Sequence, residues 1–598
     1  MTAERRNLWW LAAAWLLVGV LMTLLSWGNL AQRQFPDPDD VMRLLQVRDW
    51  IGGQSWFDVT QYRLNPPDGV PMHWSRLVDV PLAAVILLLR PFAGQQGAET
   101  AALVAVPLIT LGIAMLLVQR VGLKLMNGGP ALAAAIAAPF SLGGLKQMRP
   151  MRIDHHGWQI VMALTALLAA LDPRPRRSGV VAGAAMAVWM NISMEGLPFA
   201  AAFGALFAWQ WLADPAATGR LKAYLASLAA SSLLLFGFTH WPSTWAHQPH
   251  DVITPAYLAA FAAAAAVCAL AVRPGVAELR TRLLSLAAAG GLALGAAFAV
   301  DPHWLVGPFG SLDPVVREFW YDRVDEGLPV WRIDWGESAT GLAQPLVGLI
   351  GTVFALWRTS GAGRRPWAIY AFVLFALTLG GMFVIRTETT ASVVALPGTA
   401  FLCALALKRA QNLSLMPARV VGSAAAACIM TPAYAVPLSV TSVDQRLETA
   451  ARAWGDCMAK SEVDRLRTLP TGYIAAPLDI TPAILVDTGH RALATGHHRN
   501  VTGMRDAIRL FVFPLPEARE IVARRQFDYI IFCPGAPEAI RYANRGPFGL
   551  SAALRTGKAP EWLERVPIRG LHGLQVWRVR KDLLEAEARA PIPSVGKL

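Results

Sequence analysis

Long apolar runs separated by short polar loops dominate the chain from Leu8 to about Pro437. Many of these runs approach the ~20 residues that a membrane-spanning helix needs. A shorter run, Val80 to Leu89, is bracketed by Pro81 and Pro91, and we expect it not to cross but to form an interfacial or re-entrant helix. About 13 spans then remain. They begin near residues 8, 100, 130, 157, 179, 196, 222, 254, 283, 341, 367, 392 and 418.

Basic residues in the short loops indicate how these spans are oriented. If the run at residue 80 does not cross, every inner loop carries at least two positive charges, starting with Arg5 and Arg6 at the N-terminus. Cytoplasmic loops are enriched in Lys and Arg, so the arrangement in which the run at residue 80 does not cross is favoured. It places the N-terminus in the cytoplasm and the loops 31–79, 146–156 and 301–340 on the outer face.

Composition agrees with a membrane protein. The chain is 55% hydrophobic and 16% charged, whereas soluble proteins average about 25% charged residues. The net charge of +13 would suggest nucleic acid in a soluble protein, but here the charge lies in loops that set orientation. We therefore predict a multi-pass protein of a bacterial inner membrane that binds no nucleic acid.

The tail, residues 441–598, is polar and alternates short strand-like runs with helical patterns. Strands are expected at Tyr473–Ala476, Ala483–Val486 and Tyr529–Phe532, and a helix at Pro516–Arg525. The sequence thus predicts a membrane domain over 1–440 and a small periplasmic α/β domain over 441–598.

Five cysteines show no metal-binding spacing. Cys268, Cys403 and Cys428 lie in apolar runs and are expected to be packing residues. Cys457 and Cys533 lie in the tail, and their pairing is a minority expectation that requires an extracytoplasmic tail.

Charge and imidazole gather where one apolar segment gives way to the next, in Arg152-Ile-Asp154-His155-His156. Such groups are costly to desolvate at a membrane edge and usually mark a working site. Asp154 and His156 can both face one metal ion on an irregular loop. The alternative is a polar pair at a helix start, where Asp meets the helix dipole.

A second acidic cluster, Asp37-Pro-Asp39-Asp40, follows the first apolar run, and His73 lies later in the same loop. Carboxylates suit a hard divalent cation, although Asp is also favoured at helix starts. The count of positive charges in the loops places both clusters on the outer face of the membrane. We therefore favour a metal ion that the two clusters share.

Two further charged residues are candidates. Glu326 lies in the long loop 301–340, and the alternative there is a solvated surface helix. Arg386 opens a late span, where it either snorkels to the interface or clamps a phosphate with its planar donors. Glu195 is expected to be a structural acid. The tail histidines, His490, His497 and His498, are expected to be structural or to contact an acceptor.

At these residues the chain resembles the catalytic subunit of single-chain oligosaccharyltransferases, which belong to the GT-C class of membrane glycosyltransferases. Asp39 followed by Arg48-Asp49 resembles the motif of their first outer loop, and Asp154-His155-His156 resembles the Asp-His-His form of their second. Val324-Asp325-Glu326 is similar to the acceptor-side signature, and Arg386 with Pro397 to the pyrophosphate-contacting pair. The family's Trp-Trp-Asp acceptor motif does not occur in the tail.

The resemblance implies a GT-C fold with about 13 spans and an outer C-terminal domain. It implies transfer of a sugar or oligosaccharide from a polyprenyl-phosphate or -pyrophosphate donor to a glycan, lipid or protein acceptor, among membrane lipids. Asp39, Asp154 and His156 would hold Mg²⁺ or Mn²⁺, Arg386 would bind the donor phosphate, and Asp39, Asp154 and Glu326 would act in catalysis. Asp40, His155, Arg152 and His73 would support them.

Three other functions stay open. A polysaccharide polymerase or a lipid-modifying sugar transferase of the same architecture is the alternative among enzymes. A flippase for lipid-linked glycans would need charges along a path through the spans, whereas these acids cluster at the outer ends. A non-catalytic scaffold is the third alternative.

Overall fold

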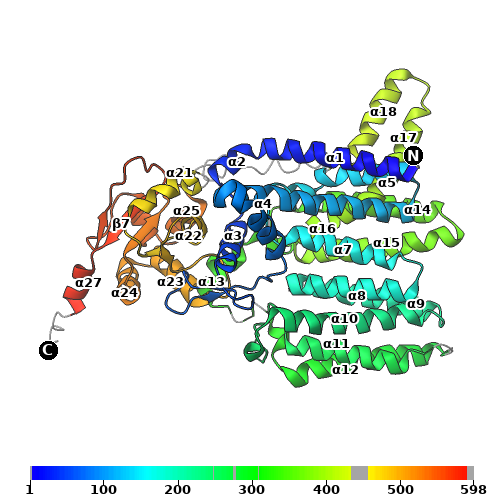
Figure 1. The fold of residues 1–598 in the computed structure, drawn as a ribbon, viewed down its shortest axis with the longest axis horizontal. Coiled ribbons are helices and arrows are strands. Elements are labelled where there is room, and N and C mark those ends of the chain that lie inside the picture. The colour runs from blue at the N-terminus through cyan, green and yellow to red at the C-terminus, as the bar shows by residue number, and fades with distance from the viewer. Residues whose placement is uncertain are drawn as a thin grey trace.

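The computed structural model describes residues 3–246, 248–273, 276, 278–307, 309–310, 312–431 and 456–588. The predicted boundary between the two domains, at residues 440 and 441, lies outside these described residues. Two parts are evident in Figure 1: a bundle of long helices and a mixed helical and stranded domain at one end of it.

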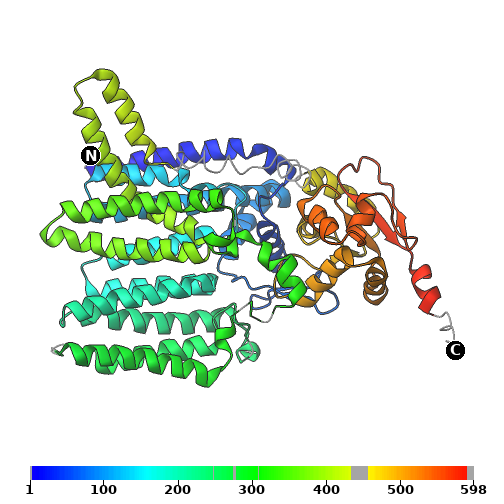
Figure 2. The ribbon, with the colours of Figure 1, turned by 180° about the vertical axis from the view of Figure 1, so that it is seen from behind.

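Helices of the bundle run side by side in Figures 1 and 2. Within the described residues, 7 helices are long and apolar enough to span a membrane, or 8 if the bent pair α16 and α17 counts as one span. Shorter apolar helices accompany them, so the count of about 13 spans remains a prediction. The bundle helices are α1 (Ala3–Leu25), α4 (Asp79–Leu125), α5 (Gly128–Ala137), α7 (His156–Ala170), α8 (Pro175–Ile192), α9 (Leu197–Ala213), α10 (Thr218–Thr239), α11 (Pro255–Ala271), α12 (Leu279–Val300), α14 (Trp335–Arg358), α15 (Arg364–Phe383), α16 (Thr387–Val394), α17 (Leu396–Gln411) and α18 (Met416–Cys428).

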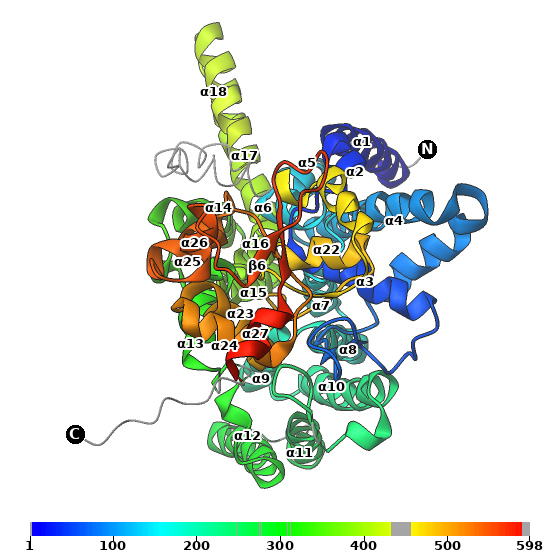
Figure 3. The same cartoon turned by 90° about the vertical axis from the view of Figure 1, so that its left-hand side faces the viewer.

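The run that was expected not to cross begins α4. This helix is broken at Gly94, whose φ of 67° lies in the left-handed region that glycine tolerates. Figure 3 shows α4 projecting from the side of the bundle. The break separates the run at Val80 from the long apolar segment that follows it.

Small residues allow neighbouring helices to approach closely. A Cβ at Gly179 or Gly183 on α8 would collide with the backbone oxygens of Arg220 and Tyr224 on α10. Close backbone approach of this kind is typical of helix packing within membranes. These contacts lie in the first halves of the two helices. At their other ends Asn191 donates to Thr239 at 3.1 Å, beside a cavity described below.

The C-terminal domain contains a five-stranded sheet in the order β4-β3-β5-β7-β6. β3 pairs in parallel with β4 and β5, whereas β7 pairs antiparallel with β5 and β6. The strands are β3 (Tyr473–Ala475), β4 (Arg491–Ala492), β5 (Tyr529–Phe532), β6 (Leu563–Arg565) and β7 (Gln575–Val579). Its helices are α21 (Lys460–Val463), α22 (Thr481–Asp487), α23 (Val501–Val512), α24 (Leu515–Arg525), α25 (Pro537–Arg545), α26 (Leu550–Arg555) and α27 (Lys581–Ala588).

Most predicted elements of the tail are confirmed. The strands at Tyr473 and Tyr529 and the helix ending at Arg525 are present as β3, β5 and α24. The strand predicted at Ala483–Val486 is wrong, because these residues belong to α22. Thr481 and Pro482 start that helix, and its residues are buried on every side, so the run lacks the alternation of a strand.

Cys457 and Cys533 form a disulfide, so the minority expectation of a pairing is confirmed. Cys268 and Cys403 are buried as expected, whereas Cys428 on α18 is exposed on the surface of the protein. The prediction that Cys428 packs inside was therefore wrong, because an apolar run in a membrane helix also supplies the outer face.

The domain docks on the end of the bundle where the three predicted outer loops gather. The first loop forms α2 (Trp27–Gln32), α3 (Pro38–Ile51), β1 (Thr60–Gln61) and β2 (Val70–Pro71), and the second begins with α6 (Leu142–Gln147). Arg63 of the first loop donates to the backbone oxygen of Thr488 at 2.8 Å, and Leu64 forms an isolated bridge with Ala492. In the third loop, α13 (Pro314–Phe319) packs against α23.

Candidate active site

Asp40, on the first turn of α3, holds the loop that carries Asp154. It is fully buried. Its Oδ1 accepts hydrogen bonds from the backbone nitrogens of Ile153 at 2.8 Å and Asp154 at 2.9 Å, and its Oδ2 accepts from Arg152 at 2.8 Å. The oxygens of Asp40 are therefore occupied in fixing two loops against each other, which gives this residue and Arg152 a positioning role.

The Asp154 cluster (Asp154, His155 and His156) lies just before α7. Asp154 Oδ1 is 2.6 Å from His155 Nδ1, and Asp154 Oδ2 is 2.6 Å from His156 Nδ1. Burial raises the pKa of Asp154, but the two imidazoles outweigh it and hold that pKa well below its usual range. The carboxylate is therefore ionised at neutral pH, and both of its oxygens face basic partners.

Arg43 on α3 completes the surroundings of Asp154. It is fully buried and donates to Asp154 at 3.2 Å and to Asp79 at 3.1 Å. The sequence interpretation missed it, although it follows Asp39 by one helical turn and so lies on the same face of α3. That spacing was the signal that could have found it.

Asp39 is a partly exposed acid of the site. Its side chain is 31% exposed, and its Oδ1 lies 3.2 Å from Nε2 of His497, which the C-terminal domain supplies. Burial raises its pKa, whereas the hydrogen bond and the charge of His497 lower it, and the net direction is downward. His497 was expected to be structural or to contact an acceptor. No local signal placed it against Asp39, because the two are far apart in the chain.

Arg386, immediately before α16, faces two acids. It forms an ion pair with Glu195, and its Nη1 lies 3.4 Å from Oε1 of Glu326. Its backbone nitrogen also donates to the backbone oxygen of Glu326 at 3.1 Å. The long loop 301–340 is thereby folded down onto the start of α16, with a guanidinium between two carboxylates.

These predicted residues lie near one another at the mouth of the bundle. Asp39 interacts electrostatically with Asp154, and Arg386 interacts with both. Glu326 interacts with His156 and Asp39. In the part of the chain that the structure describes, the tightest group of possible metal ligands here is Asp154, His155 and His156, with ligand atoms within 4.8 Å of one another, and Asp39 lies outside it.

His73 was predicted as a possible supporting residue, and its ring centroid lies 6.4 Å from that of His497. It belongs to the Asp251 cluster (His73, Asp251 and His498), the other described group with metal-ligand spacing. Asp251 accepts from Arg499 Nη2 at 2.8 Å and Nε at 2.8 Å, and its Oδ2 is 2.7 Å from His498. Burial raises the pKa of Asp251, but His498 and Arg499 depress it strongly. A bidentate guanidinium already satisfies this carboxylate, which joins the loop between α10 and α11 to the C-terminal domain.

No protein-family model matches the sequence, and none of the curated proteins matches it. Solved structures do match. The archaeal oligosaccharyltransferase AglB from Archaeoglobus fulgidus, in complex with an inhibitory peptide and a dolichol-phosphate, matches with a TM-score of 0.62 and 14% identity over 92% of this chain and 72% of that chain. The Archaeoglobus fulgidus oligosaccharyltransferase tethered to an acceptor peptide matches with a TM-score of 0.57 and 13% identity over 91% and 72%.

At such identity the likeness concerns the fold. It covers the bundle and the C-terminal domain together, since the match extends over nine-tenths of the chain. The resemblance that the sequence motifs suggested is thus confirmed at the level of architecture: this chain has the fold of the GT-C membrane glycosyltransferases of the oligosaccharyltransferase type.

Proposed function

We propose that this protein is a metal-dependent glycosyltransferase that moves a sugar or oligosaccharide from a polyprenyl-linked phosphate or pyrophosphate donor to an acceptor at the outer face of a membrane. The observation that carries the proposal is the buried, ionised Asp154 with its two imidazoles, in one electrostatic network with Asp39 and Arg386. The structural neighbours, solved with a dolichol-phosphate or a tethered acceptor peptide, support a lipid-linked donor and a separate acceptor.

The side chains present fit a divalent cation. Nε2 of His156 is buried and has no hydrogen-bond partner among the described residues, and the Asp154 carboxylate lies beside it. Asp154 and His156, with Asp39 nearby, would hold Mg²⁺ or Mn²⁺. When bound, such an ion would neutralise the charge that develops on the departing phosphate.

Arg386 would bind the phosphate of the donor, because its planar guanidinium can donate two parallel hydrogen bonds to phosphate oxygens. Glu195 and Glu326 hold it in place meanwhile. Asp39 is ionised, partly exposed and close to Asp154, so it would accept the proton of the acceptor nucleophile. Glu326 would position the acceptor.

The location we propose is a bacterial inner membrane, with the N-terminus in the cytoplasm and the C-terminal domain in the periplasm. The Cys457–Cys533 disulfide supports an outer position for that domain, because disulfides persist in oxidising compartments. The positive charges of the predicted inner loops support the same orientation.

The test replaces Asp154 by Asn and follows the envelope glycans by mass spectrometry in cells whose own gene is deleted. We expect Asp154→Asn to abolish the product that wild type restores, a loss of at least about 10²-fold per folded molecule, which exceeds what the fall in thermal midpoint from unpairing the buried Arg43 can explain. Asp172→Asn is the matched control, since Asp172 follows the opposite end of α7, bound to Arg174. Full product from Asp154→Asn would overturn the proposal.

Two further measurements separate the parts of the proposal. Transfer by detergent-solubilised protein should fall on chelation and return with Mg²⁺ or Mn²⁺; activity that survives chelation would remove the metal from the proposal. A flippase would show no transfer once the membrane is dissolved, so solubilised transfer also distinguishes an enzyme from a transporter.

A further inference from the structure

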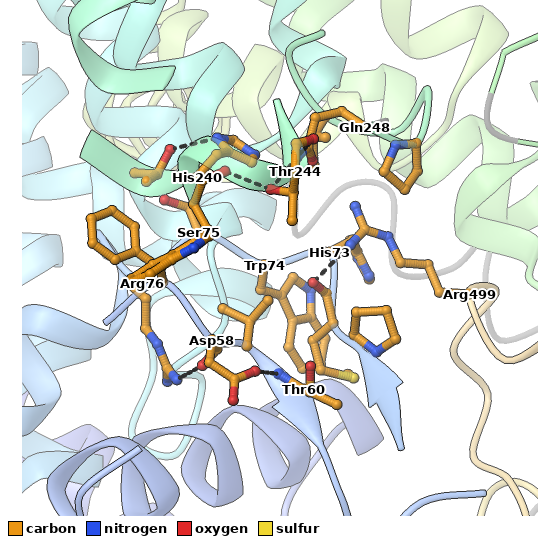
Figure 4. Close-up of a pocket in the computed structure, with 18 of the residues that line it drawn as sticks. Asp58, Thr60, His73, Trp74, Ser75, Arg76, His240, Thr244, Gln248 and Arg499 are labelled. Atoms are coloured by element: carbon orange, nitrogen blue, oxygen red, sulfur yellow. Dashed lines mark hydrogen bonds between the residues drawn. The ribbon is translucent and has the colours of Figure 1, made fainter. Parts of the chain in front are cut away.

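A cavity of about 560 Å³ opens beside the candidate active site, within the size range of ligand pockets. Figure 4 shows His240, Thr244 and Gln248 on one side of it, Asp58 and Thr60 on the opposite side, and Arg499 at a third side. The first outer loop, the ends of α8 and α10, the loop after α10 and the C-terminal domain all contribute to the wall. Nothing in the proposed chemistry uses this cavity.

The cavity wall consists mostly of neutral side chains that can form hydrogen bonds. Ser55, Thr60, Thr244 and Gln248 line it, together with the rings of Trp74 and His73. Hydroxyl and amide groups both donate and accept hydrogen bonds. This wall therefore favours a ligand that offers hydroxyl or carbonyl oxygens.

The two arginines in the wall are ion-paired within the protein, although Nε of Arg76 has no hydrogen-bond partner among the described residues. Arg499 binds Asp251 with two nitrogens and donates to the backbone oxygen of Met72 at 2.9 Å. Arg76 lies 3.3 Å from Asp79 and also donates to Gln54 at 3.0 Å. Neither guanidinium is left to attract an anion, so the cavity favours an uncharged ligand.

Neutral hydrogen-bonding groups and aromatic rings complete the lining. Ser75 donates to Asn191 at 2.8 Å, and Asn191 donates to Thr239 at 3.1 Å, so hydroxyl and amide groups form a continuous row. Trp241 remains 49% exposed and packs edge-on against Phe57, with ring centroids 5.1 Å apart. Sugars combine hydroxyl edges with apolar C–H faces, and this lining offers a partner for each.

Trp74 separates the cavity from the active site by the width of one ring. The Arg43 guanidinium lies over this ring at 4.8 Å from its centroid, and Arg43 also contacts Asp154. The His497 ring meets Trp74 edge-on at 4.9 Å, and His497 also contacts Asp39. A sugar in the cavity is therefore near the reacting groups but cannot itself be the reacting sugar.

We propose that this cavity binds an uncharged oligosaccharide segment, consisting of the sugar units beyond the one that reacts. The inference rests on the proposed function and narrows it, because a glycan that fills both places contains at least two sugars. The segment belongs either to the lipid-linked donor or to an acceptor glycan. Both sources present the same hydroxyl-rich, neutral chemistry.

The test measures binding without catalysis. Two probes are used: neutral oligosaccharides released by mild acid from polyprenyl lipids of the cells that carry the gene, and neutral oligosaccharides released from their finished envelope glycans. Saturation-transfer NMR with the purified full-length protein in detergent should detect binding of at least one pool. Trp241→Ala should weaken it by about 10-fold or more, and Trp241→Phe should retain most of it. Trp335→Ala is the control, because Trp335 is 61% exposed and does not line the cavity.

The pool that binds identifies the donor or the acceptor as the source. Binding of neither pool, or equal binding by Trp241→Ala and wild type, would overturn the inference. Asp154→Asn keeps the experiment independent of the proposed function: it should bind the oligosaccharide like wild type while transfer is lost. Binding that persists when Asp154→Asn leaves transfer intact would reject the proposed chemistry and not the cavity.

Discussion

The Asp154 cluster and the Asp251 cluster both join one aspartate to two histidines, but their surroundings differ. Asp154 shares its oxygens with two imidazoles and a single nitrogen of Arg43, and Nε2 of His156 has no partner among the described residues. Asp251 is bound by two nitrogens of Arg499 and by His498, and it links two parts of the chain. The comparison teaches that the same ligand spacing can occur in different surroundings: a guanidinium already satisfies the carboxylate in the Asp251 cluster, whereas the Asp154 cluster keeps an imidazole nitrogen without a partner among the described residues.

Arg386→Ala should produce the largest effect, because it removes the cation that would bind the leaving phosphate beside the Asp154 cluster. We expect transfer by solubilised protein to fall by about 10²–10³-fold, and Arg386→Lys to recover part of it, since ammonium keeps the charge but not the two-pronged geometry. Arg332→Ala is the matched control, an outer-loop arginine whose partner is Asp322. Equal loss in both variants would contradict a specific phosphate-binding role.

Asp251→Asn should weaken the contact of Asp251 with Arg499 and His498 and leave the rate of transfer nearly unchanged. Removing one partner of a buried ion pair is destabilising by roughly 3–5 kcal/mol, so the thermal midpoint should fall and limited proteolysis should release the C-terminal domain sooner. Transfer per folded molecule should stay within a few-fold of wild type. If instead transfer disappears while the midpoint is unchanged, the Asp251 cluster is a working site and the comparison fails.

His156→Gln and His498→Gln compare the two clusters in their response to metal. His156→Gln removes the imidazole whose Nε2 has no partner among the described residues. This variant should need at least about 10-fold more Mg²⁺ or Mn²⁺ for half-maximal transfer. The His498 variant should keep the wild-type requirement. Identical metal titrations for all three proteins would exclude His156 as a ligand.

Lowering the pH should produce the smallest effect, a change in the free energy of unfolding. The direction of this change follows from the depressed pKa of Asp251. A carboxyl whose pKa is depressed in the folded protein stabilises it fully above the unfolded value of about 3.9, and this stability is lost as pH falls below that value. The difference in stability between wild type and Asp251→Asn should therefore be constant down to pH 5 and smaller by roughly 1 kcal/mol at pH 3. Chemical unfolding of both proteins across this range measures it. A difference that stays the same from pH 5 to pH 3 would show that folding does not depress the pKa of Asp251.

Much of this arrangement could be predicted from the sequence, because membrane helices and charged membrane edges leave strong local signals. The long apolar runs and Asp154-His155-His156 stood out for that reason, and the Cys457–Cys533 pair was foreseen as a minority outcome. The strand expected at Ala483 failed because a short apolar run fits a buried helix equally well. The metal-ligand role predicted for Asp39, Asp154 and His156 is still a prediction.

Contacts between distant segments could not be predicted. His497 meets Asp39 only after the domain has folded onto the bundle, and Asp40 holds Ile153 through backbone groups that carry no residue signature. His73, a possible supporting residue of the predicted site, lies in the Asp251 cluster and 6.4 Å from the His497 ring, and no local pattern indicated either contact. Such pairings depend on the docking of whole elements, which no local pattern encodes.

The contact between Asp39 and His497 also has a consequence for biogenesis. The ribosome makes Asp39 and Asp154 early, but the imidazole that sits against Asp39 belongs to the last quarter of the polypeptide. A nascent chain interrupted before His497 would contain every helix of the bundle through α18 but would lack the imidazole beside Asp39. The contact between Asp39 and His497 can therefore form only after residue 497 of the 598-residue chain has been made.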